Sequence, residues 1–172
     1  MAERMGVKCL NTFAFDMFHV ICSESTKNEF ISPFSVLTAL NMALVGANKN
    51  TKKEMFEGLR YNLGFSDTFE VHCFFKKLLD DYKQFDLCNL ILANRALLHK
   101  SPNFRVNPDY AAHIAYFYGS ELNEANFITD KEAIIHTCNE WVNEMTNGKI
   151  PSILNSLHRD DSSACKCNLF QR

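Results

Sequence analysis

Apolar residues near the start of the chain recur at steps of three and four, which is the spacing of one face of an α-helix. This stripe consists of Leu10, Phe13, Ala14, Met17, Phe18 and Ile21. A polar stretch over 23–28 ends the pattern, and Phe30 and Ile31 form a short extended run. The spacing predicts a first helix whose apolar stripe packs against other parts of the chain.

The next predicted helix has clear signals at both ends. Ser32 is a good N-cap residue, and Pro33 suits the first helical position, where no intrahelical bond needs its missing N–H. Gly46 predicts the end of the helix. Between them almost every side chain is apolar, namely Phe34, Val36, Leu37, Ala39, Leu40, Met42, Ala43, Leu44 and Val45. A helix without a polar face predicts a place in the middle of a sizeable protein.

Two more helices are predicted before the first strand. Thr51 and Glu54 have the spacing of a capping box, which predicts a short helix with Met55, Phe56 and Leu59 on its apolar side. The following helix covers 68–82, and its apolar residues at helical spacing are Phe69, Val71, Phe74, Phe75, Leu78, Leu79 and Tyr82. Its outward lysines and aspartates are mixed in sign, which predicts a solvated face rather than a basic binding site.

The pattern changes over 87–99, where both alternating sets of residues are mainly apolar. Such a run predicts a strand that is covered on both faces. Asn107 and Pro108 again read as a cap and a first turn, and they open a helix that runs through Tyr118. A last helix is predicted from about Asp130, with Gly148 placed to end it; it buries Ile134, Cys138, Trp141, Val142 and Met145.

Length and charge narrow the class of protein. A chain of 172 residues fits one domain, and we find no linker or internal repeat. Apolar residues make up 47% and charged residues 22%, as in soluble globular proteins. The net charge is −2, so no single-sign field favours nucleic acid or acidic lipid. No apolar run approaches the ~20 residues of a membrane-spanning helix. We therefore expect no nucleic-acid partner and no membrane partner.

The number and spacing of the cysteines predict the cellular compartment of the protein. The seven cysteines are an odd number and lack the regular spacing of a disulfide framework, so we expect reduced thiols. The first residues lack the basic-then-apolar order of a signal peptide, and no Asn-x-Ser/Thr sequon occurs. These features predict a cytoplasmic protein, with an extracellular location through unconventional export as the alternative.

Two separated stretches resemble the serpin family. The first, over 30–40, reads Phe-Ile-Ser-Pro-Phe-Ser-Val-Leu-Thr-Ala-Leu. The second contains Asn-Glu-Trp-Val at 139–142 and Thr-Asn-Gly-Lys-Ile at 146–150, and it resembles the sixth helix of the family and the turn after it. Between them, Ala-Asn-Arg-Ala-Leu at 93–97 stands where a serpin has a long strand of its main sheet. The family-motif residues, which we expect to be structural, are Ser32, Pro33, Ser35, Asn94, Asn139, Trp141 and Gly148.

The resemblance covers about residues 10–157 and implies an α+β fold. We expect 1–157 to be a helix-rich N-terminal portion of a serpin, with part of the main sheet, and the C-terminal sheets and reactive loop to be missing. The apolar helix 33–46 would lie beneath the largest sheet. Ser32 and Ser35 would lie near the place where that sheet opens, or would act as helix caps and nothing more.

The same resemblance implies a function. Serpins inhibit serine-type endopeptidases through an exposed loop near the C-terminus, which the protease attacks and which then inserts into the sheet as a new strand. The partner of a full-length relative would be a serine or cysteine endopeptidase. Everything in that mechanism that touches the protease lies beyond residue 172. We therefore expect this chain to be non-inhibitory by itself.

The tail, 158–172, departs from the family pattern. It is polar and without strand periodicity, and we expect it to be a divergent, disordered segment. Synonymous codons for 163–172 exist that, moved by one nucleotide, encode Leu-Leu-Val-Asn-Ala-Ile-Tyr-Phe-Lys, which is the strand that the family has next. Our hypothesis is a change of frame near Leu157, through an indel, an altered splice junction or an annotation error.

Some residues could be mistaken for a catalytic or metal site. His158 with Cys165 and Cys167 offers three zinc ligands without the fourth of a closed site. The pairs His72 with Cys73 and His136 with Cys138 allow a cysteine-hydrolase interpretation, but each cysteine is predicted to face the core. Trp141 would anchor a partner if exposed, although its place on an apolar stripe predicts the core. We expect no metal, no cofactor and no enzymatic activity.

Two alternatives to a truncated inhibitor remain open. The strand over 87–99 would lose a neighbour in the absence of the C-terminal sheets, so its exposed edge could pair with a strand of another protein or of a second copy. The other alternative is an independent helical enzyme, which would require turnover that depends on a particular Cys or His.

Overall fold

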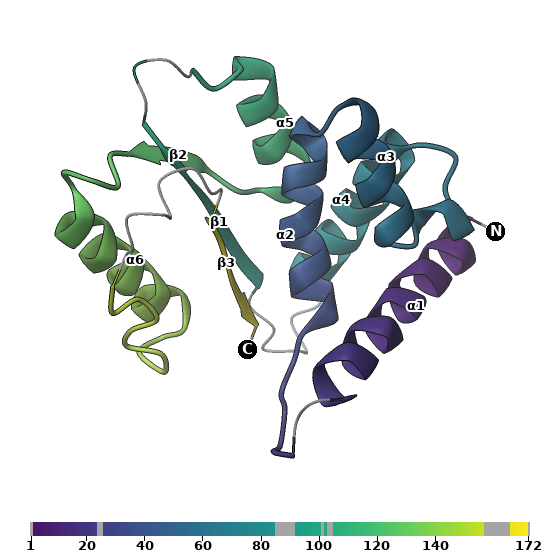
Figure 1. The fold of residues 1–172 in the computed structure, drawn as a ribbon, viewed down its shortest axis with the longest axis horizontal. Coiled ribbons are helices and arrows are strands. Elements are labelled where there is room, and N and C mark those ends of the chain that lie inside the picture. Colours follow the sequence, from purple (N-terminus) through teal and green to yellow (C-terminus); the bar gives the residue numbers. More distant parts are fainter. Residues whose placement is uncertain are drawn as a thin grey trace. The chain divides into compact units, whose positions relative to one another are not determined.

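The structure is a computed structural model that describes residues 2–23, 26–84, 92–100, 102, 105–156 and 166–171. The chain divides into two compact units, Met1–Asp86 and Leu87–Arg172. The first unit is helical, and the second combines strands with two helices (Figure 1). The first contains α1 (Ala2–Ser23), α2 (Pro33–Gly46), α3 (Lys49–Gly58), the 3-10 helix η1 (Tyr61–Leu63) and α4 (Thr68–Gln84).

Helix α2 lies at the centre of the first unit and contacts α1, α3 and α4. Leu37, Met42 and Leu44 are buried on it, as the nearly continuous apolar sequence predicts. Aromatic rings fill the space around it: Phe34 stacks on Phe75 at 5.7 Å between ring centroids, and Tyr61 meets Phe75 edge-on at 6.2 Å. This aromatic packing is the main core of the unit.

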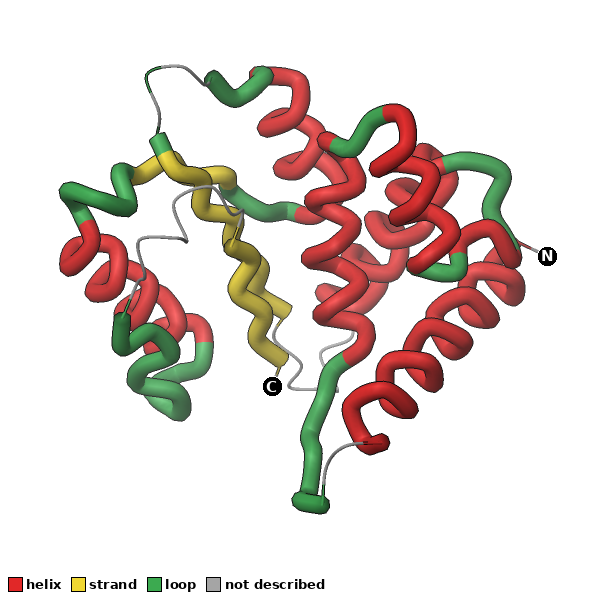
Figure 2. Tube along the Cα trace, viewed as in Figure 1, coloured by secondary structure: helices red, strands yellow, loops and turns green. Residues whose placement is uncertain are grey.

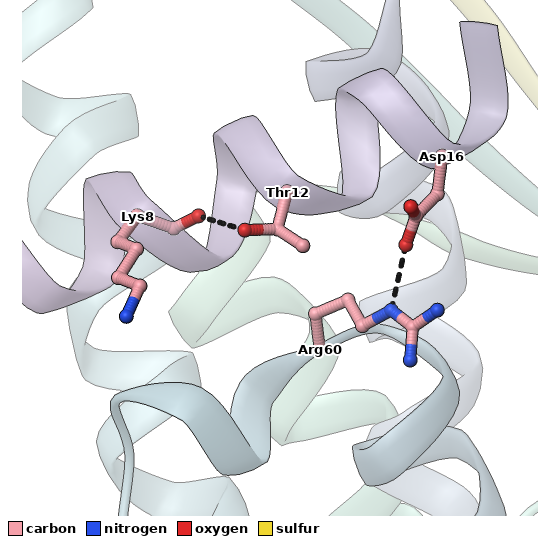
Figure 3. Close-up of polar contacts among 4 residues, drawn as sticks. All are labelled: Lys8, Thr12, Asp16 and Arg60. Atoms are coloured by element: carbon pink, nitrogen blue, oxygen red, sulfur yellow. Dashed lines mark hydrogen bonds and ion pairs between the residues drawn. The ribbon is translucent and has the colours of Figure 1, made fainter. Parts of the chain in front are cut away.

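Helix α1 is tied to its neighbours by close packing and by ion pairs. Its Gly6 lies against the ring of Phe74 in α4. Asp16 accepts from Arg60 Nε at 2.7 Å, and Thr12 donates to the carbonyl of Lys8 one turn earlier (Figure 3). The side of α1 away from these contacts carries exposed apolar residues, including Phe18, which the sequence pattern assigns to the packed stripe. That assignment is wrong for Phe18, because the packed face of α1 is centred on Cys9.

Helix α3 corrects another prediction. It begins at Lys49 rather than at Thr51, because the side chain of Asn48 accepts from Lys49 N at 2.8 Å and caps the helix three residues earlier. Thr51 therefore lies inside the first turn. The predicted starts at Pro33 and Pro108 and the predicted start after Asp130 are confirmed.

The second unit contains β1 (Leu92–His99), α5 (Pro108–Tyr118), β2 (Leu122–Ala125), α6 (Lys131–Met145) and β3 (Lys166–Gln171). The strand order is β2-β1-β3. Figure 2 shows the strands in yellow. β2 pairs parallel to β1 from Ala96 opposite Leu122 onward, and β3 pairs antiparallel to β1. Helix α6 packs on β1 through a core of Leu97, Phe127, Ile134 and Cys138.

The strand β3 contradicts the expectation of a disordered tail without strand character over 158–172. Residues 166–171 form a strand beside β1, and the predicted bare edge of β1 is paired. A polar sequence can take this place because the ladder bonds come from the backbone rather than from side chains. Residues 158–165, and 87–91 of the predicted strand, lie outside the described residues. Among the described helices, none combines the length and apolar character needed to cross a bilayer.

Candidate functional site

The two serines of the first family motif form a local cap at the start of α2. Ser35 N donates to Ser32 Oγ at 3.3 Å, and Ser32 Oγ donates to Ser35 Oγ at 2.9 Å. Pro33 occupies the first turn, and Val36 N donates to the carbonyl of Ser32 at 3.1 Å. These bonds confirm the capping role of Ser32. A role of the serines near a sheet opening stays a prediction.

A polar pair lies deep in the first unit, and the sequence patterns do not predict it. Tyr61 Oη donates to Asn41 Oδ1 at 2.7 Å, and both residues are fully buried. Asn41 Nδ2 has no hydrogen-bond partner among the described residues. Burial raises the pKa of the Tyr61 phenol, and the bond with Asn41 offsets only part of this effect. The one signal in the sequence is a single amide in the apolar run of α2.

Asn139 of the second motif holds the loop that follows α6. Its Oδ1 accepts from Ile153 N and from Leu154 N, both at 2.9 Å, and its Nδ2 donates to the carbonyl of Leu154 at 2.9 Å. One half-buried amide thus satisfies three backbone groups that have no place in a helix or strand. The contacts support a structural role for Asn139.

The end of α6 depends on a left-handed turn. Asn147 and Gly148 have φ of 50° and 77°, and Gly148 N donates to the carbonyl of Asn143 at 2.8 Å. Thr146 Oγ1 donates to the carbonyl of Val142 at 2.8 Å and accepts from Ile150 N at 3.0 Å. Gly148 is placed as predicted, because this backbone conformation favours glycine.

Trp141 is half-buried and makes a contact with β1. The guanidinium carbon of Arg95 lies 5.8 Å from the centroid of its ring, which is the geometry of a cation–π contact. The ring is therefore engaged within its own unit but is not in the core as predicted, and Met145, also predicted to be buried, is exposed. Asn94 precedes Arg95 in β1 and stands in register with Leu169 of β3.

A groove of about 650 Å³ runs along α6 beside the loop after it. His136 Nδ1 and Glu140 Oε2 lie 3.1 Å apart at its exposed wall. Its lining is Lys131, Glu132, Ile135, His136, Asn139, Glu140, Asn143, Pro151, Asn155 and Ser156. None of the described residues that line the groove carries a thiol.

The cysteine pairs do not form a hydrolase site in the described residues. Cys138 is buried beside Leu97 and Phe127, and burial raises the pKa of its thiol, while His136 lies exposed on another side of α6. The prediction that Cys73 faces the core is wrong: Cys73 is exposed and its neighbour His72 is buried. Adjacent helical residues point about 100° apart, so one of the two faces outward.

The structure describes only one of the three candidate zinc ligands. His158 and Cys165 lie outside the described residues, and Cys167 lies in β3. In the part of the chain that the structure describes, no cluster of three or more His, Cys, Asp or Glu side chains is arranged to hold a metal ion.

Comparison with known proteins finds several similar sequences. The leukocyte elastase inhibitor of Sus scrofa is 36% identical over 84% of this chain and 37% of its own length. Serpin B6 of Bos taurus is 34% identical over 83% of this chain and 38% of its own length. Serpin B8 of Homo sapiens is 33% identical over 84% of this chain and 38% of its own length. The chain thus spans about two fifths of the length of these relatives.

Comparison with solved structures also finds similar proteins. Human glycosylated kallistatin superposes with a TM-score of 0.81 at 25% identity, over 92% of this chain and 43% of that protein. Mouse protein-Z dependent protease inhibitor has the same fold, with a TM-score of 0.80 at 20% identity. The match covers 91% of this chain and 41% of that protein. A family model described as serpin (serine protease inhibitor) matches residues 8–168. The predicted α+β, helix-rich partial serpin fold is confirmed, and the chain belongs to the serpin family.

Proposed function

We propose that the polypeptide of residues 1–172 is the N-terminal portion of an inhibitor of serine-type endopeptidases and does not inhibit a protease by itself. The observation that carries this proposal is the length comparison: the chain matches 37% of the leukocyte elastase inhibitor of Sus scrofa and 38% of serpin B6. The family resemblance assigns protease contact to a loop near the C-terminus of a complete serpin. The same resemblance implies that residues 1–172 correspond to the N-terminal end of such a protein.

Exposed apolar side chains in the first unit support the view that this portion is incomplete. Phe30, just before α2, is 95% exposed, and Phe15 on α1 is 72% exposed. Each large aromatic side chain left in water forgoes roughly 1.5–3 kcal/mol of burial free energy. Such side chains are typical of surfaces that further parts of a protein cover.

The inhibition test has two arms. The polypeptide 1–172 is incubated with leukocyte elastase and with a cysteine endopeptidase, and the products are separated under denaturing conditions. We expect full residual protease activity and no denaturation-stable complex; such a complex would contradict the proposal. The second arm joins residues 1–157 to the C-terminal part of the leukocyte elastase inhibitor of Sus scrofa. That chimera is expected to form the complex if residues 1–157 are a competent serpin portion.

The origin of the tail is a separate question that the nucleotide sequence answers. We propose a change of frame near Leu157. Sequencing the transcript from the codons for Asn139 onward is expected to find Leu-Leu-Val-Asn-Ala-Ile-Tyr-Phe-Lys in another frame. A transcript that encodes no such strand would refute the hypothesis.

The three-stranded sheet supports a second candidate function, which is association with other proteins or with a second copy through a strand edge. β1 is the central strand of this sheet, and an edge of β1 without its partner would pair readily with an added strand. Light scattering over a concentration series is expected to show a complex of fixed stoichiometry. Open-ended growth would indicate aggregation instead.

We further propose a cytoplasmic location. Cys9, Cys22, Cys73 and Cys138 are free, which suits a reducing compartment. Fractionation of cells that express the chain is expected to recover it with cytoplasmic markers. Recovery from the medium of intact cells would favour the alternative of export.

A further inference from the structure

The edge of β1 that faces β3 is the place where the proposed strand-mediated association would occur. β1 runs through the middle of the sheet, and its Ala96 and Leu97 are buried. β2 covers the other edge over four residue pairs, from Ala96 opposite Leu122 to His99 opposite Ala125. The N–H and C=O groups on the remaining edge need a partner strand, because buried backbone groups without partners are costly.

The chain's own C-terminal segment supplies that partner. β3 pairs antiparallel with β1 over six residue pairs, from Leu92 opposite Gln171 to Leu97 opposite Lys166. We propose that Lys166–Gln171 acts as a built-in cap that occupies this edge of β1 and keeps it closed to strands of other polypeptides. This inference rests on the second candidate function, association through a strand edge, whose site and regulation it specifies.

The sequence of β3 favours a replaceable cap rather than a permanent core strand. It reads Lys-Cys-Asn-Leu-Phe-Gln, in which only Leu169 and Phe170 are large and apolar. Backbone hydrogen bonds, which any extended segment can make, therefore carry most of the pairing. The cap succeeds because it is tethered: a strand in the same chain competes at an effective concentration in the millimolar range. An added strand must overcome this advantage.

The register allows a direct test by disulfide formation. Ala96 of β1 stands opposite Cys167 of β3. Directly opposed residues of an antiparallel pair have Cα atoms about 4.5–5.5 Å apart, which a disulfide can bridge. Ala96→Cys, oxidised with diamide in the full chain, is expected to give an intramolecular disulfide between position 96 and Cys167, detected by peptide mapping. No such disulfide, or one that joins two chains, would overturn the proposal.

Two controls make this result specific. Ala96→Cys combined with Cys167→Ser should lose the cross-link. Ala93→Cys lies three residues earlier in β1, opposite Phe170 rather than Cys167, and should not form it. Efficient cross-linking from position 93 to Cys167 would mean that the register of the cap is wrong.

Because Ala96 is fully buried, its replacement could disturb folding, and a second measurement avoids that position. Leu169→Pro changes only the cap, since proline removes a backbone N–H and disfavours pairing. A fluorescent peptide of residues 164–172 is expected to bind the Leu169→Pro chain roughly ten- to hundredfold more tightly than the unchanged chain. A peptide with the same composition in scrambled order serves as the control.

Equal binding of the peptide to both chains, or no binding to either chain, would contradict the proposed cap. The helix content of the Leu169→Pro chain, measured by circular dichroism, verifies that the rest of the fold is intact. Neither measurement involves a protease. A result that contradicts the cap would therefore say nothing about the proposal that the chain does not inhibit proteases. Likewise, a finding that the chain inhibits a protease would not change the interpretation of the disulfide experiment.

Discussion

At the scale of single residues, the Asn41 and Tyr61 pair is the least expected feature of the first unit. Tyr61→Phe removes the donor of the 2.7 Å bond and leaves a second atom of the buried Asn41 amide without a partner. We expect a loss of about 1–3 kcal/mol in the free energy of unfolding. The double change Asn41→Ala with Tyr61→Phe should recover most of that loss, because it removes both polar groups together. Urea unfolding of Tyr61→Phe, Asn41→Ala and the double variant measures the coupling; strictly additive losses would contradict it.

The same tyrosine predicts a response to alkaline pH. Burial raises the pKa of Tyr61 in the folded state above the ordinary value of about 10. Below that value the phenol is protonated in both states, whereas above it only the unfolded chain loses the proton. The unfolded state then binds fewer protons, so stability falls as pH rises. Urea midpoints between about pH 8 and about pH 11 should fall more steeply for the unchanged chain than for Tyr61→Phe.

Gly6 tests the close packing of α1 on α4. A Cβ at this position would lie 2.5 Å from the ring of Phe74, which itself contacts Phe65 and Phe75. Gly6→Ala is therefore expected to destabilise the chain by about 1–3 kcal/mol. Gly58→Ala is the matched control: a Cβ there meets nothing within 4 Å, so thermal unfolding should show no loss. An equal loss of stability in both variants would mean that the effect comes from helix propensity rather than from packing against Phe74.

At the scale of elements, Asn139 joins α6 to the loop that follows it. Asn139→Ala removes three hydrogen bonds to Ile153 and Leu154, and each contributes about 0.5–1.5 kcal/mol. Hydrogen exchange should show loss of protection at these two amides first. Asn139→Asp keeps the acceptor oxygens and should retain part of that protection. Asn143→Ala, on an exposed position one turn further along α6, should change neither amide.

Helix starts could be predicted from the sequence where one side chain acts on its neighbours. Ser32 and Asn107 cap α2 and α5 through bonds that span two or three residues. The start of α3 was predicted wrongly because the capping-box spacing of Thr51 and Glu54 lies inside the helix that Asn48 caps. Only the contact of Asn48 with Lys49 N shows where the helix begins.

Contacts between distant positions could not be predicted. The bonds of Asn139 span 14 and 15 residues, and the bond of Tyr61 with Asn41 spans 20, so neither follows from local periodicity. β2 and β3 have four and six residues, too few for a clear alternation of apolar and polar positions. Their positions depend on the unpaired edges of β1, which is a property of the sheet rather than of their own sequences.

At the scale of the whole molecule, several large apolar side chains of the first unit are exposed. Phe15 and Phe18 on α1 and Phe30 before α2 are 72%, 54% and 95% exposed. Apolar residues that remain in water promote association, because contact between copies removes their surface from solvent. The isolated polypeptide is therefore expected to associate through these side chains as concentration rises.

Replacing Phe15, Phe18 and Phe30 with serine tests this expectation. The triple variant should associate less than the unchanged chain at the same concentration, as measured by light scattering after gel filtration. Its urea midpoint should change little, because side chains already in water contribute little to folding. Phe69→Ser on α4 is the control, since Phe69 is 64% exposed but lies on a different helix. Monomers with the Phe69→Ser change alone would show that association depends on general surface hydrophobicity rather than on the residues near α1 and the start of α2.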